Sequence, residues 1–299
     1  MDLRRLEHFL AVADHQGFTA AARAVSVSQP ALSLAVKELE AELGTVLFHR
    51  LGRRVVVTPA GAALLGPARQ ALRDVETGRA AVTAVSGLEA GSLAIASLPT
   101  LAADPLAGIV GRFRRHHPAV TVDLAAPEDS AGVVAMVRDG RRELGLTDSD
   151  QLPEGLAAHP LGRQALVLVL PPGMAPSSSP TSAGTRNPVD LATVADLPFV
   201  AAPPGTSTRR LLDEGLGGGS GAGPRVAVVT AQRDAILPLV LAGAGAALVP
   251  EATGRVAELQ GATVVRPDPP VTRSIVLIHL AGPLAPAALR FVELATDHR

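Results

Sequence analysis

The stretch Ser26–Gly44, SVSQPALSLAVKELEAELG, decides the interpretation of the N-terminal part of the chain. Ser28 is suited to cap a helix, because its hydroxyl can accept a hydrogen bond from a free backbone N–H of the first turn. Pro30 follows in that turn, where a missing N–H costs little, and Gly44 is suited to end the helix. The apolar spacing predicts one buried stripe, formed by Leu32, Val36, Leu39 and Leu43.

The face opposite this stripe carries Gln29, Ser33 and Lys37, at positions i, i+4 and i+8. Small or hydrogen-bonding side chains on such a face allow a helix to enter the DNA major groove and to contact base edges. An ordinary solvated helix surface carries similar residues, so the pattern leaves both interpretations open.

The flanking sequence predicts the other elements of a winged helix-turn-helix. Two helical stretches precede the quoted one, and VLFHRLGRRVVVT at 46–58 predicts two short strands joined as a hairpin. This hairpin, the wing, would offer Arg50, Arg53 and Arg54 to DNA phosphates. The predicted DNA-binding residues are Ser28, Gln29, Pro30, Ser33, Lys37 and the three arginines of the wing. The alternative is a small helical subdomain with a solvated face.

A long helix is predicted to follow, because Thr58 can cap it and Pro59 suits its first position. Pro67 should kink or loosen this helix. Its apolar residues have the 4-3-4-3 spacing of a coiled coil, which indicates a dimerising helix; packing on its own chain is the alternative. The residues of this seam are Leu64, Ala68, Ala71, Val75, Gly78, Val82 and Val85.

From Ser92 onward, short runs of Val, Leu, Ile and Ala alternate with amphipathic helical stretches. Such alternation predicts an α/β fold with a parallel or mixed sheet, and the remaining length is enough for two lobes. The sequence has no cysteine, which excludes disulfides and thiol chemistry, and its net charge of −1 confines any DNA-binding surface to part of the molecule. Without a signal peptide or a membrane-spanning apolar run, we expect a cytoplasmic protein and no membrane partner.

The sequence offers little evidence for an enzyme. Its eight histidines form no His-x-x-x-His pair, and GTSTR at 205–209 is not a G-x-S-x-G nucleophile turn. We therefore expect no catalytic residue, cofactor or metal site. A small-molecule-binding protein or enzyme with an accessory helical domain stays as the alternative function.

Together, these motifs resemble the LysR-type transcriptional regulators, over essentially the whole chain. SQPALS at 28–33 and TPAG at 58–61 are the most specific parts, whereas GRREL at 140–144 departs from the family pattern with Glu143 in place of Asp. The resemblance implies a DNA-reading third helix, a dimerising long helix and a two-lobed domain like the type 2 periplasmic binding proteins. The expected domains are 1–58, 59–90 and 91–299, with lobe 1 at about 91–162 plus 269–299 and lobe 2 at about 163–268.

An effector is expected between the two lobes, where helices begin after strands and offer free N–H groups. At positions matching the family, the candidates are Ser97, Thr100, Ser130, Thr206, Ser207 and, more weakly, Thr230. Six hydroxyls favour a small polar or anionic metabolite, although each hydroxyl could simply cap its own helix. The expected partners are therefore double-stranded DNA, such a metabolite, and further copies of the chain in a homodimer or homotetramer.

Overall fold

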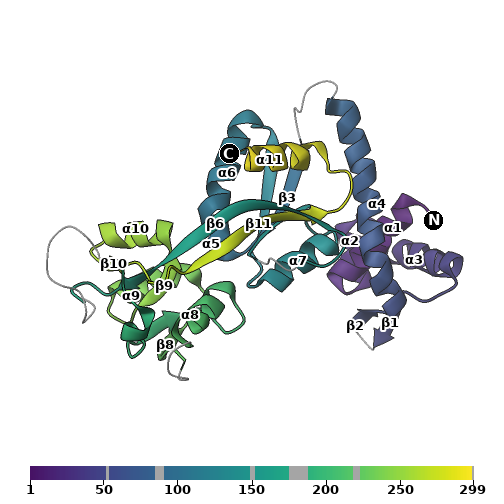
Figure 1. Cartoon of the computed structure of the whole chain (residues 1–299). Coiled ribbons are helices and arrows are strands. Elements are labelled where there is room, and N and C mark those ends of the chain that lie inside the picture. Colours follow the sequence, from purple (N-terminus) through teal and green to yellow (C-terminus); the bar gives the residue numbers. More distant parts are fainter. Residues whose placement is uncertain (52–53, 85–90, 149–151, 175–187, 218–222, 298–299) are drawn as a thin grey trace.

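A computed structural model describes residues 1–51, 54–84, 91–148, 152–174, 188–217 and 223–297. The N-terminal helices and hairpin lie at one end of the long helix α4, and the α/β part of the chain lies beside that helix (Figure 1). Among the described helices, none is long and apolar enough to cross a membrane.

The N-terminal part is the predicted winged helix-turn-helix. Its elements are α1 Leu3–His15, α2 Phe18–Ala24, α3 Gln29–Leu43, β1 Phe48–Leu51 and β2 Arg54–Val57. The two strands pair antiparallel, with Phe48 opposite Val57. Phe9 of α1 is fully buried and packs on Phe48, with ring centroids 5.3 Å apart, so the hairpin is anchored to the helical core.

Helix α3 begins and ends where the sequence predicted. The Ser28 hydroxyl accepts a hydrogen bond from the Ala31 amide at 3.3 Å, and Gly44 ends the helix in a left-handed conformation. Leu32, Val36 and Leu39 are buried as expected. The prediction for Leu43 is wrong: this side chain is 41% exposed, because it lies in the last turn, beyond the helical core.

Helix α4 spans Pro59–Ala84, and Pro67 lies within it without ending it. Thr58 caps it as predicted, accepting a hydrogen bond from the Gly61 amide at 3.0 Å. A Cβ on Gly61 would lie 2.4 Å from the Leu47 carbonyl oxygen, so glycine permits close packing there. Of the predicted seam, Leu64, Ala68 and Ala71 pack on the N-terminal core of their own chain; Val85 and the side chain of Val82 lie outside the described residues.

The α/β part is organised around one large mixed sheet of order β10-β6-β11-β5-β3-β4, with β9 also paired to β6. The strands β3 and β5 are parallel, as are β3 and β4, whereas β11 runs antiparallel to β5 and β6. The strand bounds are β3 Gly91–Ser97, β4 Val120–Ala125, β5 Leu144–Thr147, β6 Leu156–Leu170, β7 Phe199–Ala201, β8 Val226–Val229, β9 Ala247–Pro250, β10 Thr263–Val265 and β11 Thr272–Leu280.

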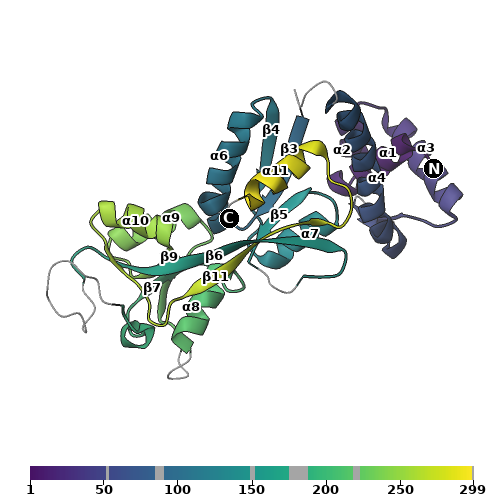
Figure 2. The same cartoon turned by 45° about the horizontal axis from the view of Figure 1, so that its top comes forward.

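Two lobes form on this framework, and the long strands β6 and β11 run side by side from one lobe into the other (Figure 2). The lobe boundary expected at 162–163 therefore falls inside β6. The helices are α5 Pro99–Leu101, α6 Ala107–His116, α7 Ser130–Arg138 and α11 Pro286–Thr296 in the first lobe, and α8 Ser207–Gly217, α9 Arg233–Leu241 and α10 Glu251–Leu259 in the second, with a π-helical turn at Ala102–Leu106 and a 3₁₀ turn at Leu191–Val194.

Each lobe has a hydrophobic core of its own. In the first lobe, Phe113 of α6 packs edge-on against Phe291 of α11, with ring centroids 5.4 Å apart. In the second lobe, Leu166 and Leu168 of β6 face one cluster, while Val167 and Val169 face another. This alternation follows from the two-residue period of a strand that is covered on both faces. The polar groups between the lobes lie outside these hydrophobic clusters.

Candidate functional site

The face of α3 that was predicted to meet DNA points away from the core. Gln29 and Lys37 are exposed and Ser33 is partly exposed, whereas the stripe opposite them is buried. Within the hairpin, Leu51 of β1 pairs with Arg54 of β2. Of the wing arginines, Arg53 and the side chains of Arg50 and Arg54 lie outside the described residues.

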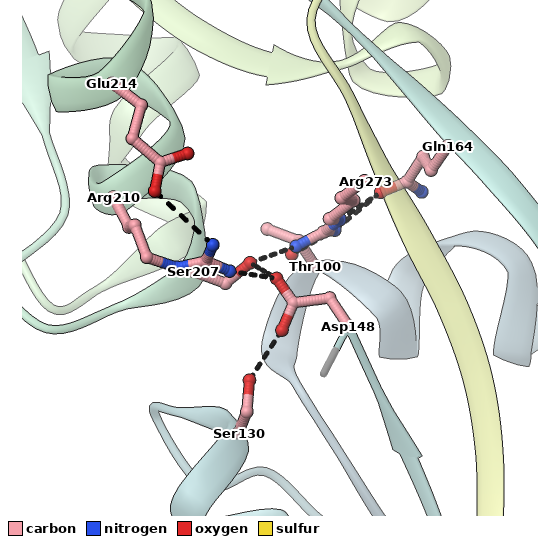
Figure 3. Close-up of polar contacts among 8 residues, drawn as sticks. All are labelled: Thr100, Ser130, Asp148, Gln164, Ser207, Arg210, Glu214 and Arg273. Atoms are coloured by element: carbon pink, nitrogen blue, oxygen red, sulfur yellow. Dashed lines mark hydrogen bonds and ion pairs between the residues drawn. The ribbon is translucent and has the colours of Figure 1, made fainter. Parts of the chain in front are cut away.

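A buried carboxylate lies between the two lobes. Asp148 directly follows β5 of the first lobe, and its side chain is fully buried. It accepts hydrogen bonds from the hydroxyl of Ser130 at 2.5 Å, from the hydroxyl of Ser207 and from the guanidinium of Arg210 at 3.0 Å (Figure 3). Ser130 is the first residue of α7, whereas Ser207 and Arg210 belong to α8. The carboxylate therefore links the N-terminal ends of helices from both lobes.

A buried guanidinium lies beside this carboxylate. Arg273 of β11 is only 3% exposed, and it donates to the Ser207 hydroxyl at 3.0 Å and to the Thr100 hydroxyl at 2.6 Å (Figure 3). Its Nε also donates to the side-chain oxygen of Gln164 at 2.9 Å. Burial lowers the pKa of Arg273 to about 10, and the charge of Asp148 opposes that shift. The guanidinium is therefore charged at neutral pH, in contact with residues of both lobes.

Gln164 of β6 extends the network further into the first lobe. Its side-chain nitrogen donates to the Asp104 carbonyl at 2.6 Å and to the Asp104 carboxylate at 3.0 Å. Ser207 stands at the centre, since its oxygen accepts from Arg273 and donates to Asp148. Such a chain from cation to hydroxyl to anion strengthens each of its hydrogen bonds. We call these residues, Thr100, Ser130, Asp148, Gln164, Ser207, Arg210 and Arg273, the interlobe network.

The structure divides the six predicted effector residues into two groups. Thr100, Ser130 and Ser207 belong to the interlobe network. The other three bind their own backbone: Ser97 donates to the Leu98 carbonyl at 3.0 Å, Thr206 donates to the Pro203 carbonyl at 2.8 Å, and Thr230 accepts from the Gln232 amide at 3.1 Å. The contacts of this second group are local, but Ser97 and Thr206 donate to carbonyls and so do not cap a helix, and the residue that caps α9 is Gln232, not Thr230.

Sequence reasoning missed three buried polar or charged members of the network. Asp148, Gln164 and Arg273 are all buried, whereas residues of these types are mostly exposed in proteins. One signal was available, because Arg273 is the only full charge in the apolar strand TRSIVLIHL. A charge inside a strand that must be buried indicates a partner nearby, and often a functional site.

Helix α7 connects the interlobe network to the N-terminal part of the chain. It begins at Ser130 in the network, and the carbonyls at its other end bind two arginines of α4. Arg69 donates to the Asp139 carbonyl at 3.1 Å, and Arg73 donates to the Gly140 carbonyl. Arg69 also pairs with Asp14 of α1. Cationic side chains suit the carbonyl end of a helix, so this contact joins α1, α4 and α7.

Two histidines meet where β6 and β11 run side by side. The Nε2 atoms of His159 and His279 lie 3.0 Å apart, which is the distance of a direct hydrogen bond between the two rings. Within the described residues, no group of three or more His, Cys, Asp or Glu side chains is placed to hold a metal ion.

Comparisons with known proteins show which protein family each of the two parts of the chain matches. Residues 3–62 match the family model "Bacterial regulatory helix-turn-helix protein, lysR family", and residues 86–299 match the model "LysR substrate binding domain". A solved structure of a full-length variant of OxyR from Pseudomonas aeruginosa matches with a TM-score of 0.76, covering 100% of this chain and 95% of that one. At 20% identity, this likeness shows the fold alone.

Curated relatives extend over most of the chain. The transcriptional regulator IlvR of Caulobacter vibrioides is 29% identical, over 99% of this chain and 98% of its own. IlvY of Escherichia coli K12, also a transcriptional regulator, is 32% identical, over 84% of this chain and 82% of its own. The chain belongs to the LysR family, as a transcriptional regulator with an N-terminal helix-turn-helix for DNA and a C-terminal effector-binding domain.

Proposed function

We propose that a small-molecule effector binds between the two lobes, at the interlobe network, and thereby changes how the protein binds DNA. One observation carries this proposal: the Arg273 guanidinium contacts Thr100 of the first lobe and Ser207 of the second. A ligand that replaces these contacts gains its full binding energy only when both lobes are in place. It therefore has the difference in affinity that is needed to shift a conformational equilibrium.

The groups in the network favour a small polar metabolite, and a carboxylate group on it would suit Arg273. Charged hydrogen bonds to a buried guanidinium are strong, and none of the network residues offers an aromatic surface for stacking. We assign Thr100, Ser130 and Ser207 to this site, together with the newly found Asp148 and Arg273. We leave Ser97, Thr206 and Thr230 out of the site, because their hydroxyls bind nearby backbone groups. The alternative of an enzyme with an accessory domain has no support from the relatives, which are regulators.

The Thr100→Val variant tests the effector site. Valine keeps the shape of threonine but removes the hydroxyl that would donate to a metabolite bound at Arg273, so the affinity for that metabolite should fall by about 1–3 kcal/mol. The measurement is titration calorimetry with any metabolite found by screening amino acids, carboxylates and phosphates against the full-length protein. Thr230→Val is the matched control, since that hydroxyl binds the Gln232 amide outside the network. Equal affinities of both variants for the metabolite would count against the site.

We further propose that α3 reads the bases of the operator. Gln29, Ser33 and Lys37 share its outward face, and Ser28 and Pro30 fix the start of the helix. We also propose that Arg50, Arg53 and Arg54 of the wing contact phosphates, which would hold the helix in register on the duplex. Because the protein acts on DNA, we place it in the cytoplasm, as a homodimer or homotetramer.

Loss of Gln29 or Ser33 should relax sequence preference. For Gln29→Ala and Ser33→Ala, we expect the difference in binding free energy between operator and scrambled DNA to shrink by about 1–3 kcal/mol for each lost base contact. Fluorescence anisotropy measures this difference, with a genomic DNA fragment that the unmodified protein retains and with a scrambled version of that fragment. Leu43→Ala, at the exposed far end of the same helix, is the control and should keep the full preference. Unchanged preference in both polar variants would show that another face reads the DNA.

We propose that α7 transmits the state of the effector site to α4. The support is its position, with Ser130 in the interlobe network and its C-terminal carbonyls bound by Arg69 and Arg73. A shift of α7 on effector binding would move the groups that hold α4 and, through Asp14, α1. Two sites that bias one packed element in this way are coupled thermodynamically.

The Arg73→Ala variant should weaken this coupling. We expect the effector-induced change in operator affinity, which is about 5- to 150-fold in typical allosteric proteins, to fall towards onefold while the effector still binds. Anisotropy titrations with and without the effector measure the change. Arg141→Ala is the control, because the ion pair of Arg141 is with the Asp139 side chain, close to the carbonyls that Arg69 and Arg73 bind. If Arg73→Ala keeps the full change, the signal passes through other contacts.

A further inference from the structure

The donors that would normally bind a free anion between the lobes are already occupied. The hydroxyls of Ser130 and Ser207, at the starts of α7 and α8, both donate to Asp148. Arg210 donates to the same carboxylate. The protein thus supplies its own negative charge at the place where a simple carboxylate or phosphate would gain most from helix N-termini.

A simple anion at this place would face Asp148 directly. Two negative charges at short range repel each other, and the repulsion is stronger at a buried site than in bulk water. If the anion instead took the hydroxyls of Ser130 and Ser207, it would leave the fully buried Asp148 with fewer donors. A buried charge that loses its partners is strongly destabilising. The charge of Arg273 alone therefore does not make the site a general anion site.

A ligand with both charges avoids this conflict. The carboxylate of such a ligand would replace Ser207 as the acceptor for Arg273, and its ammonium group would replace Ser207 as a donor to Asp148. The two protein charges are bridged by a single hydroxyl, so the two charges of the ligand must also lie close together. An amino group and a carboxylate separated by one or two carbons meet this requirement.

We propose that Asp148 makes the effector site selective for compact zwitterions, namely amino acids or similar amino carboxylates, and against simple anions. This inference rests on the proposed function, because it assumes that the effector binds at the interlobe network. It narrows the expected class of small polar or anionic metabolite to molecules that carry an amine beside the acid. Asp148 selects the ligand through its charge, whereas Arg273 holds the carboxylate.

The test uses matched ligands on the full-length protein. Titration calorimetry compares each standard amino acid with the carboxylate that lacks its amino group and with the amine that lacks its carboxylate, and inorganic phosphate is included. We expect at least one amino acid to bind, and both of its analogues to bind about tenfold more weakly or worse, since each loses a charged hydrogen bond. A carboxylate or phosphate that binds as tightly as its matched amino acid, or a lack of binding by all amino acids, would overturn the inference.

Variants separate this inference from the proposed function. Asp148→Asn should weaken the amino acid by about tenfold or more and should not weaken the matched carboxylate. Glu128→Gln is the control, because it removes a half-exposed interlobe carboxylate paired with Arg233, outside the network. Unchanged amino-acid affinity in Asp148→Asn would refute the role of Asp148. If circular dichroism shows that Asp148→Asn is unfolded, the matched ligands on the unmodified protein decide alone.

The Thr100→Val variant then shows which of the two proposals has failed. A simple carboxylate that binds and is weakened by Thr100→Val leaves the interlobe site in place and overturns only the selectivity for zwitterions. A ligand whose affinity changes in neither Thr100→Val nor Asp148→Asn binds elsewhere, and the proposed effector site itself then fails.

Discussion

Replacing Arg273 with methionine should lower the free energy of unfolding of the effector-binding domain by about 3–5 kcal/mol. Methionine keeps much of the apolar volume but removes the donors to Thr100, Gln164 and Ser207. Asp148 would then keep only the half-exposed Arg210 as a partner and lose the buried charge that Ser207 bridges to it, and weakening a buried charge's pairing is strongly destabilising. Urea unfolding followed by circular dichroism measures the change.

A matched substitution on the same boundary serves as the control. Arg233→Met removes an ion pair with Glu128, also between the lobes, but the Glu128 side chain is 51% exposed. Exposed pairs contribute about 0–1 kcal/mol, so this variant should stay close to the unmodified protein. The double variant Arg273→Met with Asp148→Leu should recover part of the lost stability, because no buried charge is left unpaired and the half-exposed Arg210 still pairs with Glu214. Equal stability of the two single variants would contradict the account of the interlobe network.

Placing aspartate at Val75 should dissociate the dimer that we propose for α4. The first three residues of the predicted seam, Leu64, Ala68 and Ala71, pack on their own chain. Gly78, one turn beyond Val75, is exposed, and a Cβ built on it would have no neighbour within 4 Å. A carboxylate buried in a helix–helix seam without a partner would weaken association by several kcal/mol. Sedimentation velocity should show a smaller particle than the unmodified protein.

The control for this experiment lies on the same helix. Ala63 is exposed near the start of α4, off the seam, so Ala63→Asp should leave the sedimentation coefficient unchanged. Circular dichroism on both variants shows whether the fold is kept, since α4 also contacts its own chain. A monomeric unmodified protein, or a Val75→Asp variant of unchanged size, would contradict the proposed dimer helix.

Local features of the fold were predictable from the sequence. Ser28, Thr58 and Gly44 act through contacts with residues three or four positions away, so their capping roles can be inferred from the spacing alone. Leu43 shows the limit of that spacing. It continues the apolar stripe of α3, yet whether it is buried depends on how far the other helices extend, which periodicity does not tell.

The candidate site was predictable only in part, for the same reason. Thr100, Ser130 and Ser207 were found because they lie where helices begin after strands, a position fixed by local sequence. Asp148 and Arg273 are far apart in the chain and meet only because β11 returns beside β5 and β6. The partner of a buried charge depends on that long-range pairing, so the hydroxyls were foreseen and the charges that they bind were not.

The most direct test of the central claim is to sequence the genomic DNA that the full-length protein retains at low salt. We predict that the unmodified protein enriches fragments sharing a motif with two related halves, as expected for a dimer that reads DNA with two copies of α3. The triple variant Gln29→Ala, Ser33→Ala and Lys37→Ala should lose this enrichment while keeping its fold. Fragments without any shared motif, or the same motif retained by the triple variant, would contradict the claim that this face of α3 makes the protein a sequence-specific regulator.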